Sequence, residues 1–163
     1  MKKLIPCLWF DTDGEAAAEL YTSVFPNSKI LGVSRYPEAA PRPAGTVMTV
    51  SFELNGQEFL ALNGGPEFTF TEAVSFQVFC EDQDEVDRYW NALSDGGEEG
   101  PCGWLKDRFG LSWQIVPTAL PRLLADPDPE RAQRVMAAML KMTKIEIDVL
   151  EEAAAEPASQ PGR

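Results

Sequence analysis

The sequence predicts an α+β fold in which a strand–helix–strand–strand–strand module occurs twice. Three observations predict this fold. Short apolar runs and helical patterns follow one another in the same order in both halves of the chain. An Asn-Gly pair at 55–56 lies between two strand-like segments, which is a strong signal for a β-hairpin. An offset of 68 residues aligns the apolar positions of the two halves: Leu8, Phe10, Ala18, Tyr21 and Phe25 fall on Phe76, Val78, Val86, Tyr89 and Leu93.

The hairpins of the two halves align at a different offset. A shift of 54 residues places Gly56 on Gly110, Phe59 on Trp113 and Leu62 on Val116. The difference between the two offsets is absorbed by the proline-rich segment 37–45, which we expect to be a loop. A repeat of this kind constrains the architecture, because each copy is one supersecondary unit.

The first module is predicted to cover residues 3–66. Residues 4–10 are bulky and apolar and end at Asp11, which is typical of a buried strand followed by a turn. Asp13 is the expected side-chain cap of the helix that follows, and Pro26 ends that helix. The remaining strands are expected over 28–36, 46–54 and 58–62.

The second module is predicted to cover residues 72–117, and helices are predicted over 118–155. The second module has a strand at 74–80, a helix at 82–93, one or two strands within 99–109 and a last strand at 111–116. One C-terminal helix starts near Pro129, since proline is favoured in a first turn, and another covers about 146–155. Residues 1–155 are thus expected to form a single domain, and residues 156–163 a flexible tail.

Composition excludes several classes of function. The chain has 14 Lys and Arg residues against 26 Asp and Glu, a net charge of −12, so it repels nucleic-acid phosphates. It has no histidine, which excludes Ser-His-Asp triads, Cys-His dyads and histidine metal sites. Its three cysteines are too few for a disulfide framework. No apolar run is long enough for a targeting segment or a membrane span, and we expect a cytoplasmic protein with no membrane or nucleic-acid partner.

Five stretches of sequence carry a family resemblance: LWFDTDGEAAAELYTSVFPNSKI, VMTVSFELNGQEFLALNGGPEF, SFQVFCEDQDEVDRYWNALSDGGE, CGWLKDRFGLSWQIVP and VMAAMLKMTKIEIDVLEEA. The two modules resemble the vicinal oxygen chelate superfamily, which includes glyoxalase I, extradiol dioxygenases and bleomycin-resistance proteins. These stretches look like its PhnB-like branch, which carries the label 3-demethylubiquinone-9 3-methyltransferase. The resemblance covers residues 2–155. It implies two modules that form a curved sheet around a cleft, and a homodimer.

The resemblance also implies where a site would lie. Metal-dependent members of the superfamily carry ligands on the first and last strands of each module, typically a Glu four residues after a turn glycine. The corresponding residues here are Gln114 and Leu60 on the last strands, and Cys7, Trp9, Ser75 and Gln77 on the first strands. None of them is His or Glu, so we expect no metal and no cofactor. Glu67 also stands where similar sequences are expected to have His.

Three hypotheses about function follow. The first is that a small organic molecule binds in the cleft, by an apolar wall and a few hydrogen bonds, with Cys7, Trp9, Ser75, Gln77 and Gln114 as the contacting residues. The second is methyl transfer to a quinol-like ring, although the loop after the first strand, 11–14, has only one glycine. The third is a metal-assisted lyase or dioxygenase with carboxylate ligands such as Glu58 or Glu67. Whether the protein is an enzyme stays open.

The same residues also have structural interpretations. Cys7 is interpreted as a buried thiol, since no histidine is available to activate it. Trp113 is expected to pack against a helix, and Asp107 to belong to a solvated charged group near a turn. Gln77 and Gln114 are equally compatible with a ligand and with hydrogen bonds to neighbouring side chains, because both ends of a buried amide need partners.

Overall fold

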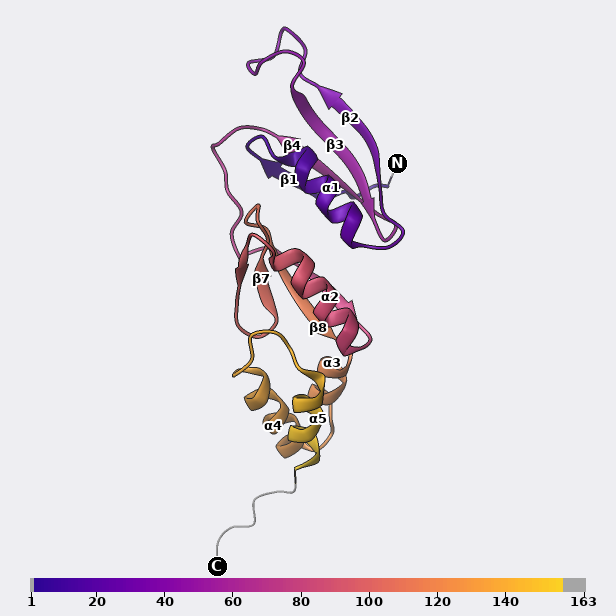
Figure 1. The fold of residues 1–163 in the computed structure, drawn as a ribbon, viewed down its shortest axis with the longest axis vertical. Coiled ribbons are helices and arrows are strands. Elements are labelled where there is room, and N and C mark those ends of the chain that lie inside the picture. The colour runs from indigo at the N-terminus through magenta and orange to yellow at the C-terminus, as the bar shows by residue number, and fades with distance from the viewer. Residues whose placement is uncertain (1, 157–163) are drawn as a thin grey trace, which may run out of the picture. The chain divides into compact units, whose positions relative to one another are not determined.

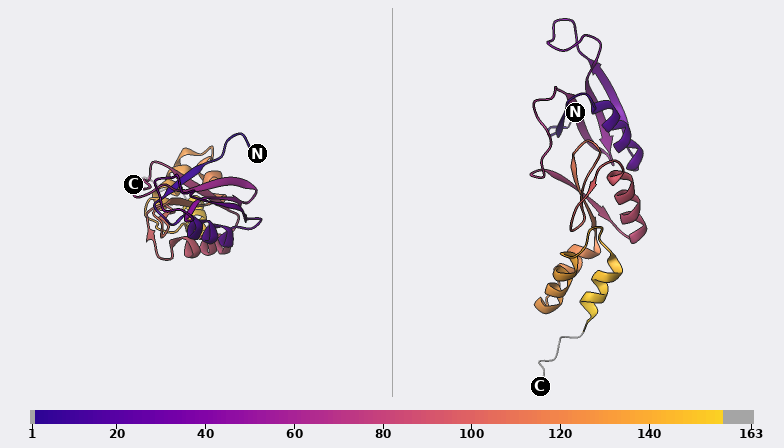
Figure 2. Two further views of the ribbon diagram at one scale, coloured as in Figure 1. Left: turned by 90° about the horizontal axis from the view of Figure 1, so that it is seen from above. Right: turned by 60° about the vertical axis from the view of Figure 1, so that its left-hand side comes forward.

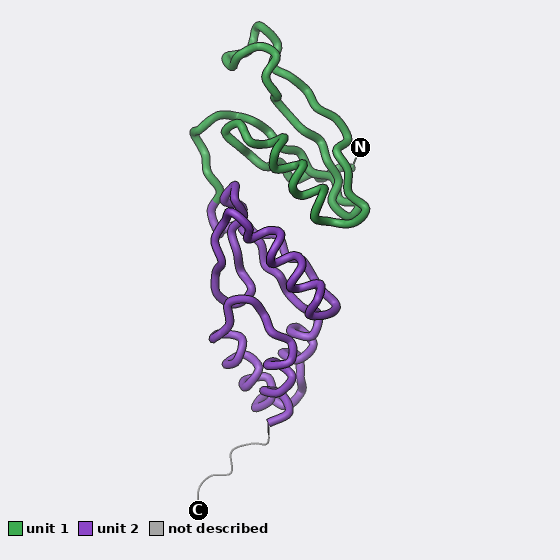
Figure 3. The backbone as a smooth tube through the Cα atoms, in the orientation of Figure 1, with its two compact units in different colours: residues 1–70 green, residues 71–163 purple. Residues whose placement is uncertain are grey.

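A computed structural model describes residues 2–156, and the chain divides into two compact units, residues 1–70 and 71–163 (Figure 3). The predicted order of elements is confirmed for the two modules (Figure 1). Unit 1 contains β1 (Cys7–Phe10), α1 (Gly14–Val24), β2 (Lys29–Arg35), β3 (Val47–Leu54) and β4 (Gln57–Asn63). Unit 2 contains β5 (Ser75–Cys80), α2 (Gln83–Ser94), β6 (Glu98–Glu99), β7 (Trp104–Lys106), β8 (Ser112–Pro117), α3 (Ala119–Leu124), α4 (Pro129–Met139) and α5 (Ile147–Ala155).

Each unit has one four-stranded sheet with the same topology. The strand order is β1-β4-β3-β2 in unit 1 and β5-β8-β7-β6 in unit 2, with the outer pairs β1–β4 and β5–β8 parallel and the others antiparallel. In unit 1, α1 packs on one face of the sheet, against β3 and β4 (Figure 2). Buried side chains on that face form the core of the unit: Leu8, Phe10, Val50, Phe52, Phe59 and Ala61.

The start of α1 differs from the sequence prediction. Asp13 occupies the N-cap position, but its side chain makes no capping hydrogen bond. The amide of Gly14 instead donates to Oδ1 of Asn63 at 2.8 Å, and Nδ2 of Asn63 donates to the carbonyl of Val47. Asn63 is 5% exposed and lies at the end of β4. The cap is therefore supplied from the sheet, by a residue distant in sequence, and a side chain at position 14 would collide with it.

In unit 2, α2 packs against β5, β7 and β8. Its start follows the sequence signal, because Oδ1 of Asp82 accepts from the amide of Glu85 at 2.8 Å. Val86, Tyr89, Trp90 and Leu93 form the buried face of the helix, as their spacing predicts.

The prediction that Asp107 belongs to a solvated charged group is wrong. Asp107 is only 2% exposed. Its carboxylate accepts hydrogen bonds from the amides of Phe109 and Leu111 and from the indole of Trp113, at 2.8 to 3.1 Å. The carboxylate thus holds the turn between β7 and β8 to a core tryptophan, while its neighbour Arg108 lies at the surface and pairs with Asp95.

The C-terminal helices have a core of their own. Leu120, Val135, Met142, Ile145, Leu150 and Ala154 form a buried cluster. Asp128 caps α4 by accepting from the amide of Glu130, and Pro129 occupies its first turn as predicted. The short helix α3, which contains Pro121, was not resolved as a separate element by the sequence pattern.

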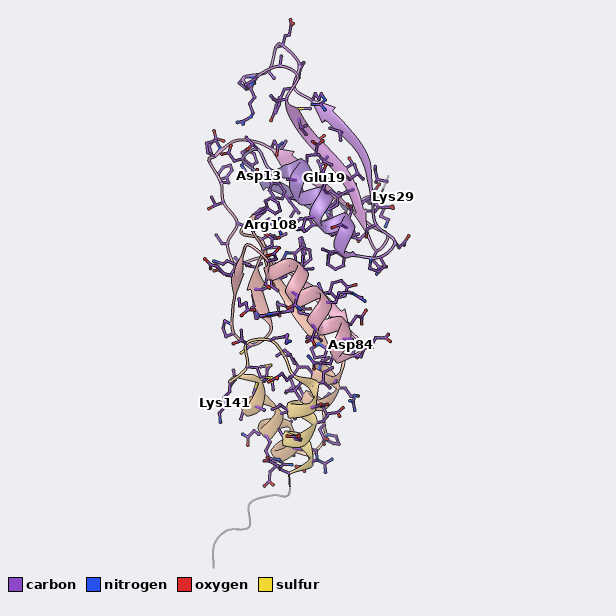
Figure 4. All side chains as sticks on the ribbon, in the orientation of Figure 1. Asp13, Glu19, Lys29, Asp84, Arg108 and Lys141 are labelled. Carbon is purple, nitrogen blue, oxygen red and sulfur yellow. The ribbon has the colours of Figure 1, made fainter. Side chains whose placement is uncertain are left out.

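Charged residues are frequent among the exposed positions. Asp13, Glu19, Lys29, Asp84, Arg108 and Lys141 are all exposed (Figure 4). Across residues 2–156, no helix combines the length and apolar character that crossing a membrane requires. The tail predicted for residues 156–163 lies outside the described residues, apart from Glu156.

Candidate functional site

The sheet of unit 2 has one face that α2 does not cover, which we call the open face. On β5, alternation places Phe76, Val78 and Cys80 toward α2 and Ser75 and Gln77 on the open face. The parallel register sets Gln77 beside Gln114 and Ser75 beside Ser112 of β8. The structure thus brings three of the five predicted site residues, Ser75, Gln77 and Gln114, onto one surface.

These three side chains form a hydrogen-bonded row. Nε2 of Gln114 donates to Oγ of Ser75 at 2.8 Å, and Nε2 of Gln77 donates to Oε1 of Gln114 at 3.4 Å. Gln114 therefore uses both ends of its amide within the protein. Gln77 is exposed, and its Oε1 is positioned to accept a hydrogen bond from a bound molecule.

A cavity of about 510 Å³, which we call the β7 cavity, lies next to this row: Ser112, the neighbour of Ser75, lines it, whereas the three residues of the row do not. The register places Trp104 of β7 beside Gln114, and Lys106 beside Ser112. The walls are mostly apolar and are completed by β6, by residues 100–102 and by Glu72. Its size suits a small organic molecule, since such sites typically measure about 300–1,000 Å³.

One ion pair lies at this cavity. Nζ of Lys106 is 2.5 Å from Oε1 of Glu72. The hydrogen bond to Lys106 lowers the pKa of Glu72, and the hydrogen bond and charge of Glu72, with the charge of Glu98, raise the pKa of Lys106. Both groups are therefore charged at neutral pH, and the positive charge of Lys106 is already matched by a carboxylate.

The other two predicted site residues, Cys7 and Trp9, lie on the equivalent face of unit 1. Cys7 is exposed rather than buried, and burial of part of its side chain raises the pKa of the thiol. Trp9 is engaged with its own unit: its indole donates to the carbonyl of Gly65 at 2.9 Å, and its ring meets Phe68 edge-on. Trp9 thus fixes the segment that follows β4.

The residues at the metal positions of the superfamily do not fit a metal ion. Gln114 is a neutral amide whose oxygen and nitrogen both have protein partners, and Leu60 has no ligand atom. Among the residues that the structure describes, no three His, Cys, Asp or Glu side chains form a group that could hold a metal. Glu58 and Glu67, the alternative ligands considered from the sequence, belong to no such group.

Sequence reasoning missed the residues of the β7 cavity, namely Trp104, Lys106 and Ser112. The alternation of β8 already implied that Ser112 shares a face with Gln114. The pairing of β7 could not be read, because that strand has only three residues and two glycines precede it closely.

Comparisons with known proteins agree with this architecture. Residues 2–116 match the family described as 3-demethylubiquinone-9 3-methyltransferase. A PhnB protein of Bacillus cereus, provisionally assigned as such a methyltransferase, is 36% identical, with a TM-score of 0.65 over 72% of this chain and 100% of that one. A search of proteins with curated descriptions gave no match.

More distant structures share the fold. Protein PA1353 of Pseudomonas aeruginosa is 19% identical, with a TM-score of 0.59 over 72% of this chain and 98% of its own. The fosfomycin resistance protein FosX of Mesorhizobium loti is 14% identical, with a TM-score of 0.54 over 77% of this chain and 100% of its own. The chain therefore belongs to the PhnB-like family described as 3-demethylubiquinone-9 3-methyltransferase, and it has the fold of the vicinal oxygen chelate superfamily.

Proposed function

We propose that the protein binds a small organic molecule on the open face of unit 2, without a metal ion. The observation that carries this proposal is the row of Ser75, Gln114 and Gln77 beside the mostly apolar β7 cavity. An apolar wall with a few oriented hydrogen-bonding groups is the usual composition of a small-molecule site. In this proposal Gln77 contacts the ligand and Gln114 orients Gln77.

Native mass spectrometry of the freshly purified protein, with metal analysis of the same sample, tests this proposal. We expect the mass of the chain with a bound organic molecule and no stoichiometric metal. Gln114→Leu should lose the bound molecule, because it removes the partner that orients Gln77. Gln57→Leu is the matched control, since Gln57 is an exposed glutamine in unit 1. A stoichiometric divalent metal would contradict the proposal and favour the carboxylate-based alternative.

Methyl transfer is the second candidate, because it is the activity in the name of the matching family. Methyltransferases that use S-adenosylmethionine usually bind it at a glycine-rich loop after the first strand of a parallel sheet. Here the segment between β1 and α1 contains no glycine, and Gly14, the first residue of α1, already donates its amide to Asn63. Saturable binding of S-adenosylmethionine in a calorimetric titration would favour methyl transfer over simple binding.

We also propose that the protein is a homodimer in the cytoplasm. The family resemblance and the 44% of hydrophobic residues in a chain of this size support a dimer, and three free cysteines suit a reducing compartment. We expect light scattering on an eluting chromatographic peak to give twice the mass of the chain at micromolar concentration. The mass of a single chain would contradict the dimer.

A further inference from the structure

The buried hydroxyl of Ser112 lies at the wall of the β7 cavity. Ser112 is 0% exposed, and its Oγ has no hydrogen-bond partner among the described residues. It stands between Ser75 on β5 and Lys106 on β7 in the strand register. A buried hydroxyl without a partner is costly, so such a group points to a molecule that completes it.

The charges around the cavity favour a positively charged ligand over a negatively charged one. Two carboxylates, Glu72 and Glu98, face it together with one ammonium group, Lys106, whereas the carboxylate of Glu99 turns to the other side of the sheet and accepts from the indole of Trp90 on α2. Glu72 already pairs with Lys106 at 2.5 Å. An anionic ligand would have to displace Glu72 from Lys106 and approach the carboxylate of Glu98. A cation meets no such opposition.

Trp104 supplies a flat surface in the same cavity. It lies on β7 beside Gln114, half-buried, with its side chain on the open face. An indole face attracts both flat rings and positive charge. The turn that closes the cavity is held in place, because the amides of Cys102 and Gly103 donate to the carbonyls of Met142 and Thr143 at 2.8 Å. The cavity is thus preformed within unit 2.

We propose that the β7 cavity binds a planar organic cation, with its ring on Trp104, a polar atom at Ser112 and its positive charge toward Glu98. This inference rests on the proposed function and narrows the class of ligand for that site. It assigns a binding role to Trp104, Ser112 and Glu98, and it places phosphonates, sulfonates and other anions among the ligands that the site rejects.

Two flat dyes of opposite charge test this proposal. Thioflavin T, a cation, and 1-anilinonaphthalene-8-sulfonate, an anion, are titrated separately into the full-length protein, and the dissociation constants are measured by fluorescence. We expect thioflavin T to bind at least about tenfold more tightly than the anion. Glu98→Gln should weaken thioflavin T about threefold to tenfold. Asp95→Asn is the matched control, because it removes the same charge from an exposed carboxylate outside the cavity.

Two further variants separate a site from a surface effect. Trp104→Ala should weaken both dyes, and Ser112→Ala should weaken thioflavin T without lowering the melting temperature, since the hydroxyl has no protein partner to lose. Tighter binding of the anion, or equal effects of Glu98→Gln and Asp95→Asn, would overturn the inferred ligand class. If Trp104→Ala still weakens dye binding in that case, the proposal that the site binds a small organic molecule is retained, and only the charge of the ligand was inferred wrongly. Dye binding that depends on neither Trp104 nor Gln114 would overturn the proposed function as well.

Discussion

At the scale of single residues, Asp107 shows how a polar side chain can be part of the core. Its carboxylate accepts three hydrogen bonds while only 2% exposed, one of them from the indole of Trp113. Hydrogen bonds from N–H groups to a carboxylate are stronger than hydrogen bonds between neutral groups. The role of Asp107 is therefore to hold the start of β8, which carries Ser112 and Gln114.

We predict that Asp107→Asn lowers the free energy of unfolding by about 2 kcal/mol or more. The new NH₂ group of the asparagine cannot accept a hydrogen bond, so at least one of the three N–H donors, from Phe109, Leu111 or Trp113, would lose its acceptor. Urea unfolding followed by tryptophan fluorescence measures the change. Asp95→Asn, which removes an exposed carboxylate paired with Arg108, should change stability by less than about 0.5 kcal/mol. Equal effects of the two substitutions would contradict this role.

Cys80 is a second residue whose properties come from its surroundings. Burial, followed by the charges of Glu85 and Asp82, raises the pKa of its thiol to about 12 from 9.0, and Arg88 opposes this shift. In the folded protein the thiol stays neutral, whereas in the unfolded chain it loses its proton above pH 9. The unfolded state therefore binds fewer protons between pH 9 and about 12, and stability falls as pH rises through this range.

We predict that Cys80→Ala removes part of this pH dependence. The difference in free energy of unfolding between the natural protein and the variant should be constant below pH 9 and should shift in favour of the variant above it. Denaturant titrations at several pH values measure this difference, and other titrating groups cancel in it. A difference that does not change with pH would contradict the account.

At the scale of elements, Gln83 joins the C-terminal helices to the second module. Its Nε2 donates to Asp87 and to the carbonyl of Ile145, and its Oε1 accepts from the amide of Ile147 at the start of α5. Lys144 adds an ion pair with Asp87 at 2.7 Å, which lowers the pKa of Asp87. These contacts hold the segment 142–147. In the same segment, the carbonyls of Met142 and Thr143 accept from the amides of Cys102 and Gly103 at the wall of the β7 cavity.

We predict that Gln83→Ala destabilises the segment 142–147 and speeds up its hydrogen exchange. Loss of the three hydrogen bonds should lower the free energy of unfolding by about 1–3 kcal/mol. Hydrogen exchange should speed up at the amides of Ile147, Cys102 and Gly103 more than in unit 1. Gln57→Ala, at an exposed hairpin position, is the control and should leave these rates unchanged. Faster exchange confined to Ile147 would show that the turn at 102–103 is held independently.

At the scale of the whole molecule, the net charge of −12 determines how stability depends on salt. Like charges at the surface repel one another, and salt screens this repulsion over about 10 Å at 0.1 M. We predict that the melting temperature rises by a few degrees when NaCl is raised from about 10 to about 150 mM at pH 7. Differential scanning calorimetry checks this. A melting temperature that falls with salt would mean that local ion pairs such as Lys106–Glu72 outweigh the repulsion.

The sequence alone determined the order of elements in the two modules, the repeat and the face on which the residues of β1, β5 and β8 lie. These features depend on hydrophobic periodicity, which is local. The alternation of Ser75, Phe76, Gln77 and Val78 therefore places Ser75 and Gln77 together on the open face without any tertiary contact. The Asn-Gly hairpin followed from turn chemistry that involves adjacent residues only.

The tertiary structure decided which polar groups have partners. Asn63 caps α1 in place of Asp13, Asp107 is buried, and Ser112 is left without a partner beside a cavity. The cap from Asn63 and the surroundings of Ser112 depend on atoms from positions far apart in the chain, for which a single sequence carries no signal. The partners of Asp107 lie within six positions of it, and only the packing of its turn decided that it is buried. The fold could be predicted because it follows from the spacing of hydrophobic residues that are close in sequence. The site could not be predicted, because it depends on how β7 pairs with β8.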